Sequence, residues 1–106
     1  MKIEFEQVYL RELYEEGKAS GKKHRFQPQV IMLDKKAIVR LEIANRIEDL
    51  YLIASLNYEK LSGDKNGLES VRVNDQYRIE FKSHKEGEEP QTITVCSIVE
   101  LSKHYK

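Results

Sequence analysis

The chain of 106 residues predicts an α+β fold, in which two to three N-terminal helices pack on a mostly antiparallel sheet of four to five strands. Apolar residues before position 55 recur at steps of three and four, as on one face of a helix. After that position they recur at every second residue, as in strands, and Gly, Asn and Asp separate the runs. This length predicts one domain, residues 1–106.

The N-terminal part predicts a strand and then a helix. Lys2–Phe5 alternates polar and apolar residues, which is typical of a short strand. Val8–Glu16 has apolar residues at helical spacing, and Gly17 follows as a natural helix stop. We therefore expect the first helix to end at Glu16.

The main helix is expected over residues 28–45. Pro28 suits the first turn of a helix, and a stripe of apolar residues follows it at helical spacing, namely Val30, Leu33, Ala37, Leu41 and Ala44. Asn45 and Glu48 match a capping box. They predict a second short helix that runs to about Ile53.

The C-terminal half predicts an antiparallel meander. Four runs have alternating or β-branched residues: Asn57–Leu61, Glu69–Val73, Tyr77–Lys82 and Thr92–Leu101. Consecutive strands with connections this short pair antiparallel. The first strand of the chain is expected at an edge of this sheet.

Composition excludes several classes of protein. No apolar run approaches the roughly 20 residues of a membrane span, and the single cysteine, Cys96, excludes an internal disulfide. Its place in TITVCSIV favours an apolar strand residue over a nucleophile. A reducing cytoplasm fits this composition. The 18 basic and 18 acidic residues give no net charge, so any binding of nucleic acid needs a local basic face.

Two arginines define the candidate site. Alternation places Val71 and Val73 on one face of a hairpin and Arg72 on the other, and Arg78 on the returning strand shares the face of Arg72. Two guanidinium groups side by side suit a phosphate group. The alternative interpretation is an ordinary solvent-facing pair, neutralised by Glu69 and Glu80.

The central segment resembles a known toxin family. The pattern L-x-G-x-x-x-G, followed by S-V-R-V-N-x-x-Y-R-I-x-F, is similar to that of the RelE/ParE toxin superfamily, and especially to HigB-type killer proteins. The stretches RFQP, RIEDL, SLNYEKLSGDKNG and the ending ELSKHYK extend the likeness over nearly the whole chain. The resemblance implies a RelE-like fold.

The resemblance also implies a function. Such toxins are ribosome-dependent mRNA interferases, in which the 2′-hydroxyl of the RNA attacks the adjacent phosphate. They are held inactive by an antitoxin, usually a HigA-like helix-turn-helix protein, and they use no metal or other cofactor. The partners implied are therefore the antitoxin, the ribosome and mRNA.

Site roles follow from the same resemblance. Arg72 and Arg78 match the family's catalytic arginines, and His104 is the candidate for proton transfer because histidine titrates near neutral pH. Asn74 is expected to contact a phosphate, and Tyr105 to stack on an RNA base.

Two positions depart from the family pattern. Relatives often carry histidine and lysine where this chain has Glu59 and Ser62. Lys60 is expected to supply the missing charge and bind RNA, although alternation directs its side chain to the opposite face unless the strand bulges. Two alternatives therefore stay open: a ParE-like toxin that inhibits gyrase by binding, and a RelE-fold interaction protein without catalytic activity.

Overall fold

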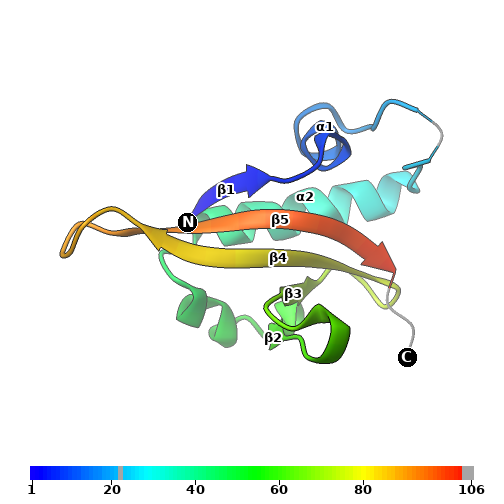
Figure 1. Ribbon diagram of the computed structural model, residues 1–106. Coiled ribbons are helices and arrows are strands. Elements are labelled where there is room, and N and C mark those ends of the chain that lie inside the picture. The colour runs from blue at the N-terminus through cyan, green and yellow to red at the C-terminus, as the bar shows by residue number, and fades with distance from the viewer. Residues whose placement is uncertain (22, 104–106) are drawn as a thin grey trace.

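The computed structural model describes residues 1–21 and 23–103 and contains a five-stranded sheet in the order β1-β5-β4-β3-β2 (Figure 1). The strands are β1 (Lys2–Phe5), β2 (Glu59–Lys60), β3 (Glu69–Arg72), β4 (Tyr77–Glu86) and β5 (Ile93–Lys103). Edge strand β1 pairs with β5 in parallel, and the other neighbours are antiparallel. The α+β fold with a mostly antiparallel sheet is thus confirmed, as is the edge position of the first strand.

The two α-helices begin where the sequence predicts. Helix α1 spans Val8–Glu16 and ends at Gly17, whose φ of 78° is in the left-handed region that favours glycine. Helix α2 spans Pro28–Ile43 and has proline in its first turn. Three short 3-10 helices follow, η1 (Ile47–Leu52), η2 (Ala54–Leu56) and η3 (Gly63–Lys65).

The short helix after α2 differs from its prediction. It is a 3-10 helix, and its cap is formed by Asp49 instead of Glu48. The Asp49 carboxylate accepts the backbone N–H groups of Asn45 at 3.1 Å and Arg46 at 3.3 Å. The helix starts two residues after Asn45, so the residue at the third helical position, which can reach back to the cap, is Asp49.

The strands differ from their predicted bounds mainly in length. β2 has two residues, whereas β4 continues beyond its predicted end at Lys82 as far as Glu86, which pairs with Ile93 near the predicted start of β5. Backbone hydrogen bonds hold this outer part of the hairpin, so it needs no apolar face. Gly87, with a φ of 96°, lies in the turn that connects the two strands.

The hydrophobic core lies between the helices and one face of the sheet. Leu13 of α1 and Leu41 of α2 pack with Val71, Ile79 and Phe81 of the sheet, and all five are fully buried. Cys96 of β5 belongs to the same core, and burial raises its pKa to about 11. The expected apolar role of this cysteine is confirmed.

The other face of the sheet carries polar side chains, and we call it the outer face. It is the face of Arg72, Arg78, Glu80 and Ser102, which alternate with core residues along β3, β4 and β5. Among the residues that the structure describes, no helix has both the length and the apolar character to cross a membrane.

A carboxyl group lies inside the helical layer. Asp34 occupies the buried stripe of α2 between Val30 and Ala37, and it is 2% exposed. Burial raises the pKa of Asp34 from its ordinary 3.8 to about 7, and the charge of Lys35 opposes this shift. The folded state therefore holds this proton at pH values where the unfolded chain has lost it.

Because the folded state binds this proton more tightly than the unfolded chain does, the fold becomes less stable as the pH rises. Between about pH 4 and pH 7 the folded state binds more protons at Asp34, so the free energy of unfolding should fall by up to about 4 kcal/mol over this range. Asp34→Asn cannot lose a proton and should lack this contribution. Urea denaturation of both proteins at pH 4, 6 and 8 measures the difference, and parallel curves for the two proteins would contradict the assignment.

Candidate functional site

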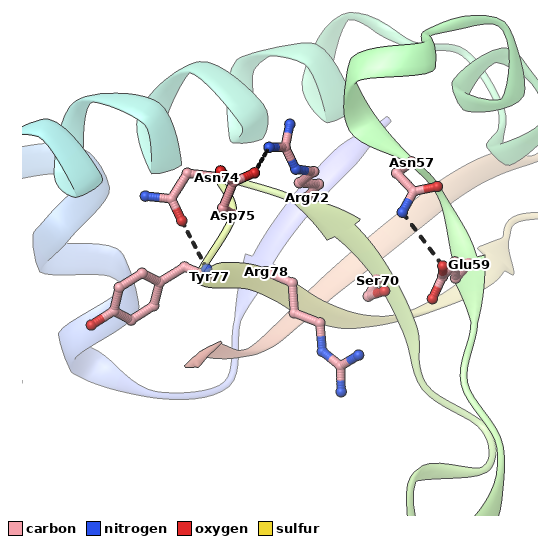
Figure 2. A pocket seen from close by; sticks show the side chains of 8 residues that line it. All are labelled: Asn57, Glu59, Ser70, Arg72, Asn74, Asp75, Tyr77 and Arg78. Carbon is pink, nitrogen blue, oxygen red and sulfur yellow. Dashed lines mark hydrogen bonds and ion pairs between the residues drawn. The ribbon is translucent and has the colours of Figure 1, made fainter. Parts of the chain in front are cut away.

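A pocket of about 140 Å³ lies on the outer face near the tip of the β3–β4 hairpin (Figure 2). Its walls come from the end of η2, from β2, from β3, from the connecting turn and from the start of β4. The lining residues are Asn57, Glu59, Ser70, Arg72, Asn74, Asp75, Tyr77 and Arg78. Three of the residues singled out in the sequence, Arg72, Asn74 and Arg78, thus meet in one pocket.

The two arginines are direct neighbours across the hairpin. Arg72 pairs with Arg78, and the adjacent Val71 pairs with Ile79. Both apolar residues of the second pair are fully buried, whereas the Arg72 side chain is 44% exposed. The predicted separation of the faces of this hairpin is confirmed, and it follows from the period of two in a strand.

The guanidinium groups do not form a parallel, unpaired platform. Arg72 turns toward Asp75 of the connecting turn and forms an ion pair with it, while the Arg78 guanidinium points away from Arg72 (Figure 2). Arg78 donates from Nε to Oε2 of Glu80 at 3.1 Å. The interpretation in which Glu80 neutralises an arginine is thus correct for Arg78, whereas Asp75, which the sequence did not indicate, neutralises Arg72.

The two ion pairs differ in their surroundings. The Asp75 side chain is 78% exposed, and exposed pairs contribute at most about 1 kcal/mol, so a ligand can displace Asp75 from Arg72 at little cost. The Arg78 side chain is only 18% exposed, and its partner Glu80 is buried. Since the Arg78 contact uses Nε, both terminal nitrogens can still face a ligand.

The part of the lining that the structure describes has no net charge. Its two arginines are balanced by Glu59 and Asp75. The Glu59 carboxylate accepts a hydrogen bond from the Asn57 side-chain amide at 3.4 Å. Because the arginines are opposed by acids, attraction of a phosphate depends on rearrangement within the pocket or on cations just outside it.

The turn between the strands is shaped by Asn74. Its side-chain oxygen accepts the backbone N–H groups of Gln76 at 2.9 Å and Tyr77 at 2.8 Å. This is the local hydrogen bonding that makes asparagine a turn residue. Asn74 therefore has a structural role in the turn in addition to its place in the pocket wall. Tyr77 packs edge-on against Phe26 with ring centroids 5.6 Å apart.

The structure does not bring Lys60 into the pocket. Glu59 pairs with Ser70 and Lys60 with Glu69, so the two residues of β2 point to opposite faces, and Glu59 is the one in the lining. No bulge in β2 reverses this order. Lys60 therefore points away from the pocket, as the alternation of side chains along a strand predicts.

The C-terminal candidates, His104 and Tyr105, lie outside the described residues. Lys103, the last residue of β5, pairs with Tyr77 of the pocket. Strand β5 therefore carries the chain to the rim of the pocket at the point where the described part of the chain ends.

A buried carboxylate lies on the outer face beside the pocket. Oε2 of Glu80 accepts hydrogen bonds from Lys65 Nζ at 2.6 Å, Ser102 Oγ at 2.9 Å and Arg78 Nε at 3.1 Å. Burial alone would raise the pKa of Glu80, but the hydrogen bonds from Lys65 and Ser102 and the nearby cations outweigh it and lower the pKa below 4.5. Glu80 is therefore ionised at neutral pH. The position of Glu80 on the outer face follows from the alternation along β4, whereas its contact with Lys65 follows from no local pattern.

Potential metal ligands lie elsewhere. Within the described part of the chain, Glu4, His84 and Glu86 form a group whose ligand atoms lie within 4.8 Å of one another. All three side chains are exposed, and none of them lines the pocket. Among the described residues, the pocket lining has two carboxylates and neither histidine nor cysteine.

Comparisons with known proteins agree on a toxin family. The family model described as RelE-like toxin of type II toxin-antitoxin system HigB matches residues 3–94. Toxin HigB-1 of Vibrio cholerae is 34% identical over 86 residues, which cover 77% of this chain and 83% of that protein. A solved structure, the YoeB/ParE toxin from Agrobacterium tumefaciens, is similar with a TM-score of 0.60 and covers 99% of this chain and all of its own. At 14% identity this last likeness concerns the fold alone.

The assignment of the two faces can be tested on adjacent residues of β3. Val71→Asp should prevent folding, because an unpaired buried charge costs several kcal/mol against a total stability of about 5–15 kcal/mol. Arg72→Ala removes an exposed ion pair and should change the free energy of unfolding by less than about 1 kcal/mol. Circular dichroism during thermal melting measures both. A cooperative transition of V71D near that of the parent would show that the faces are reversed.

Proposed function

Because the chain belongs to the HigB-like family of RelE-like toxins of type II toxin–antitoxin systems, we propose that it is an endoribonuclease that cuts mRNA on the ribosome. A toxin of such a system has an antitoxin as its partner, and the proposal is that this partner is a HigA-like helix-turn-helix protein. The toxin would act in the cytoplasm, where translating ribosomes are found. The observation that carries the proposal is the direct pairing of Arg72 with Arg78 in one pocket of a matching fold.

The proposed reaction is attack of an RNA 2′-oxygen on the neighbouring phosphorus atom. The 2′-hydroxyl gives its proton to a general base as its oxygen bonds to phosphorus, the bond from phosphorus to the 5′-oxygen breaks, and the leaving oxygen takes up a proton from a general acid. The products are a 2′,3′-cyclic phosphate and a 5′-hydroxyl. The protein would contribute alignment of the reacting atoms, stabilisation of phosphate charge and proton transfer, without a metal ion.

The residues would divide these tasks. Arg78 would bind the scissile phosphate with its terminal nitrogens, and Arg72 would join it after exchanging Asp75 for a phosphate oxygen. Asn74 would contact a neighbouring phosphate from the turn. Beyond Lys103, His104 would transfer a proton and Tyr105 would stack on a base.

Glu59 is a second candidate for the proton acceptor. Of the two carboxylates in the lining, Asp75 is occupied by Arg72, whereas Glu59 contacts only the neutral amide of Asn57 among the polar contacts that the structure describes. Carboxylates serve as general bases in many enzymes. Comparison of Glu59→Gln with His104→Ala in a cleavage assay separates the two roles. Full activity of both variants would exclude both residues as the base.

The balance of charge in the lining supports an alternative function. A chain whose pocket arginines are all opposed by acids suits a RelE-fold protein that binds its partner without cutting RNA. Pulse labelling after induced expression separates the candidates. Arrest of methionine incorporation supports the ribonuclease, arrest of thymidine incorporation supports a gyrase inhibitor, and normal incorporation of both supports the inactive protein.

Substitution of the pocket arginines should relieve toxicity. Arg78→Ala and Arg72→Ala should each restore growth and lower mRNA cleavage by about 100-fold, because each removes a charge that faces the phosphate. Arg11→Ala is the matched control, since Arg11 is an exposed arginine with an acidic partner, Glu15, on α1. Growth curves and primer extension on a reporter mRNA measure the effect. Equal toxicity of R78A and R11A, with both folded, would remove Arg78 from the site.

The ends of the cut RNA identify the chemistry. Attack by the 2′-hydroxyl should leave a 5′-hydroxyl, which polynucleotide kinase labels without prior treatment with phosphatase. A message with a single 2′-deoxynucleotide on the 5′ side of the cut should resist cleavage there. A 5′-phosphate end, or cleavage at the deoxy position, would point to hydrolysis by an external water instead.

A further inference from the structure

The buried carboxylate of Glu80 and the cation of Lys65 have no role in the proposed reaction as described so far. Resting on the proposed function, we infer that Glu80 is the positioning residue for Arg78, and that Lys65, bound to the same carboxylate oxygen, is an additional phosphate-binding residue of the site. The Arg78 side chain would thus have a fixed orientation, whereas the Arg72 side chain could leave Asp75 and turn to the phosphate.

The first support is the burial of Glu80. It is 1% exposed although it lies on the outer face, where its register partner Ser70 lines the pocket. A carboxylate in such a place stays ionised only when charged or polar donors surround it. Its three donors, Lys65, Ser102 and Arg78, come from η3, β5 and β4, and all contact the single atom Oε2.

The second support is the nitrogen that Arg78 uses. A hydrogen bond from Nε fixes the plane of the guanidinium group, because Nε and the two terminal nitrogens are coplanar. The terminal nitrogens are then held in one direction, and Figure 2 shows them at the far end of the side chain, away from the hairpin. An oriented fork of donors suits a phosphate better than a freely rotating one.

The third support is charge. Arg72 and Asp75 cancel each other, whereas Arg78 and Lys65 share a single carboxylate and keep one positive charge between them. The Lys65 side chain is 41% exposed, so its ammonium group can reach a ligand on the surface. Both cationic nitrogens lie within 3.1 Å of Glu80 Oε2. A phosphate at Arg78 would therefore also be attracted by Lys65.

The experiment compares two buried carboxylates of one hairpin. Glu80→Gln removes the charge that holds Arg78 and Lys65. The matched control is Glu69→Gln on the core face of β3, since Glu69 is also buried but accepts hydrogen bonds from Tyr58 and Ser83 at 2.5 Å and contacts no arginine. The assay is single-turnover cleavage of a ribosome-bound mRNA at saturating toxin, with thermal melting of each variant in parallel.

We expect E80Q to cleave at least about tenfold more slowly at saturation, because misplacing a group that contacts the reacting phosphate lowers the rate of the chemical step. E69Q should cleave at the parent rate per folded molecule. In the Arg78→Ala background E80Q should add no further loss, since the residue through which it acts is gone. Lys65→Met should raise the toxin concentration needed for half-maximal cleavage.

Several results would overturn the inference. They are an unchanged rate in folded E80Q, equal losses in E80Q and E69Q, and losses that multiply when R78A and E80Q are combined. An unchanged half-maximal concentration in K65M would remove Lys65 from the site. If E80Q does not fold, Glu80→Asp, which keeps the charge but withdraws the carboxylate from Arg78 Nε by one methylene group, takes its place with the same expected results.

A second readout separates this inference from the proposed function. The Nε–H proton of Arg78 should give a slowly exchanging NMR signal in the free parent protein, and the signal should be lost or exchange rapidly in E80Q but not in E69Q. This result does not depend on cleavage. If the parent protein cuts no RNA, the ribonuclease proposal fails while the NMR comparison still decides the positioning of Arg78.

Discussion

Strand β4 is hydrogen-bonded on both sides, to β3 and to β5, and this double pairing fixes the direction of each of its side chains. Ile79 and Phe81 point into the core, and Arg78 and Glu80 point to the outer face. The core therefore sets the position of the site. A shift of β4 by one residue would move both arginine and carboxylate to the wrong face and would expose the core residues.

The balance of charge in the pocket has a parallel in the whole chain, which has equal numbers of basic and acidic residues. Neither the chain nor the described part of the pocket lining has an excess of positive charge that would attract RNA from a distance. Binding would depend on individual contacts at short range. The exposed pair of Arg72 with Asp75 is easily exchanged, and the buried Glu80 keeps Arg78 in a fixed orientation, so the two arginines suit different tasks at one phosphate.

Much of this fold could be predicted because its signals are local. Gly17 ends α1, Pro28 begins α2, and the alternation around Val71 and Ile79 fixes the faces of the hairpin. The same alternation located Arg72 and Arg78 in one site. Prediction was less successful at the cap before η1, where the pattern indicated Glu48 and the adjacent Asp49 forms the cap instead.

The remaining features of the site depend on contacts between residues far apart in the sequence. Lys65 reaches Glu80 from 15 positions away, and Ser102 reaches it from 22. No periodicity of a single segment reveals such contacts, because they depend on how η3 and β5 pack against β4. The outer part of β4, from Ser83 to Glu86, was also missed, since backbone pairing holds it without an apolar face of its own.

The irregularity in the pairing of β4 with β5 affects the site as well. Glu80 pairs with Glu100 and Phe81 with Ile98, so Val99 is an extra residue without a partner, and its carbonyl group accepts a hydrogen bond from Gln7 at the start of α1. This insertion reverses the alternation of β5, so that Leu101 enters the core and Ser102 faces Glu80. If the same residues paired without this bulge, Leu101 would point outward and Ser102 into the core, whereas a homologue that lacks the extra residue would keep both faces through regular pairing. An alignment of relatives along β5 must therefore allow a gap of one residue at Val99, because only then is the position of Ser102 matched correctly.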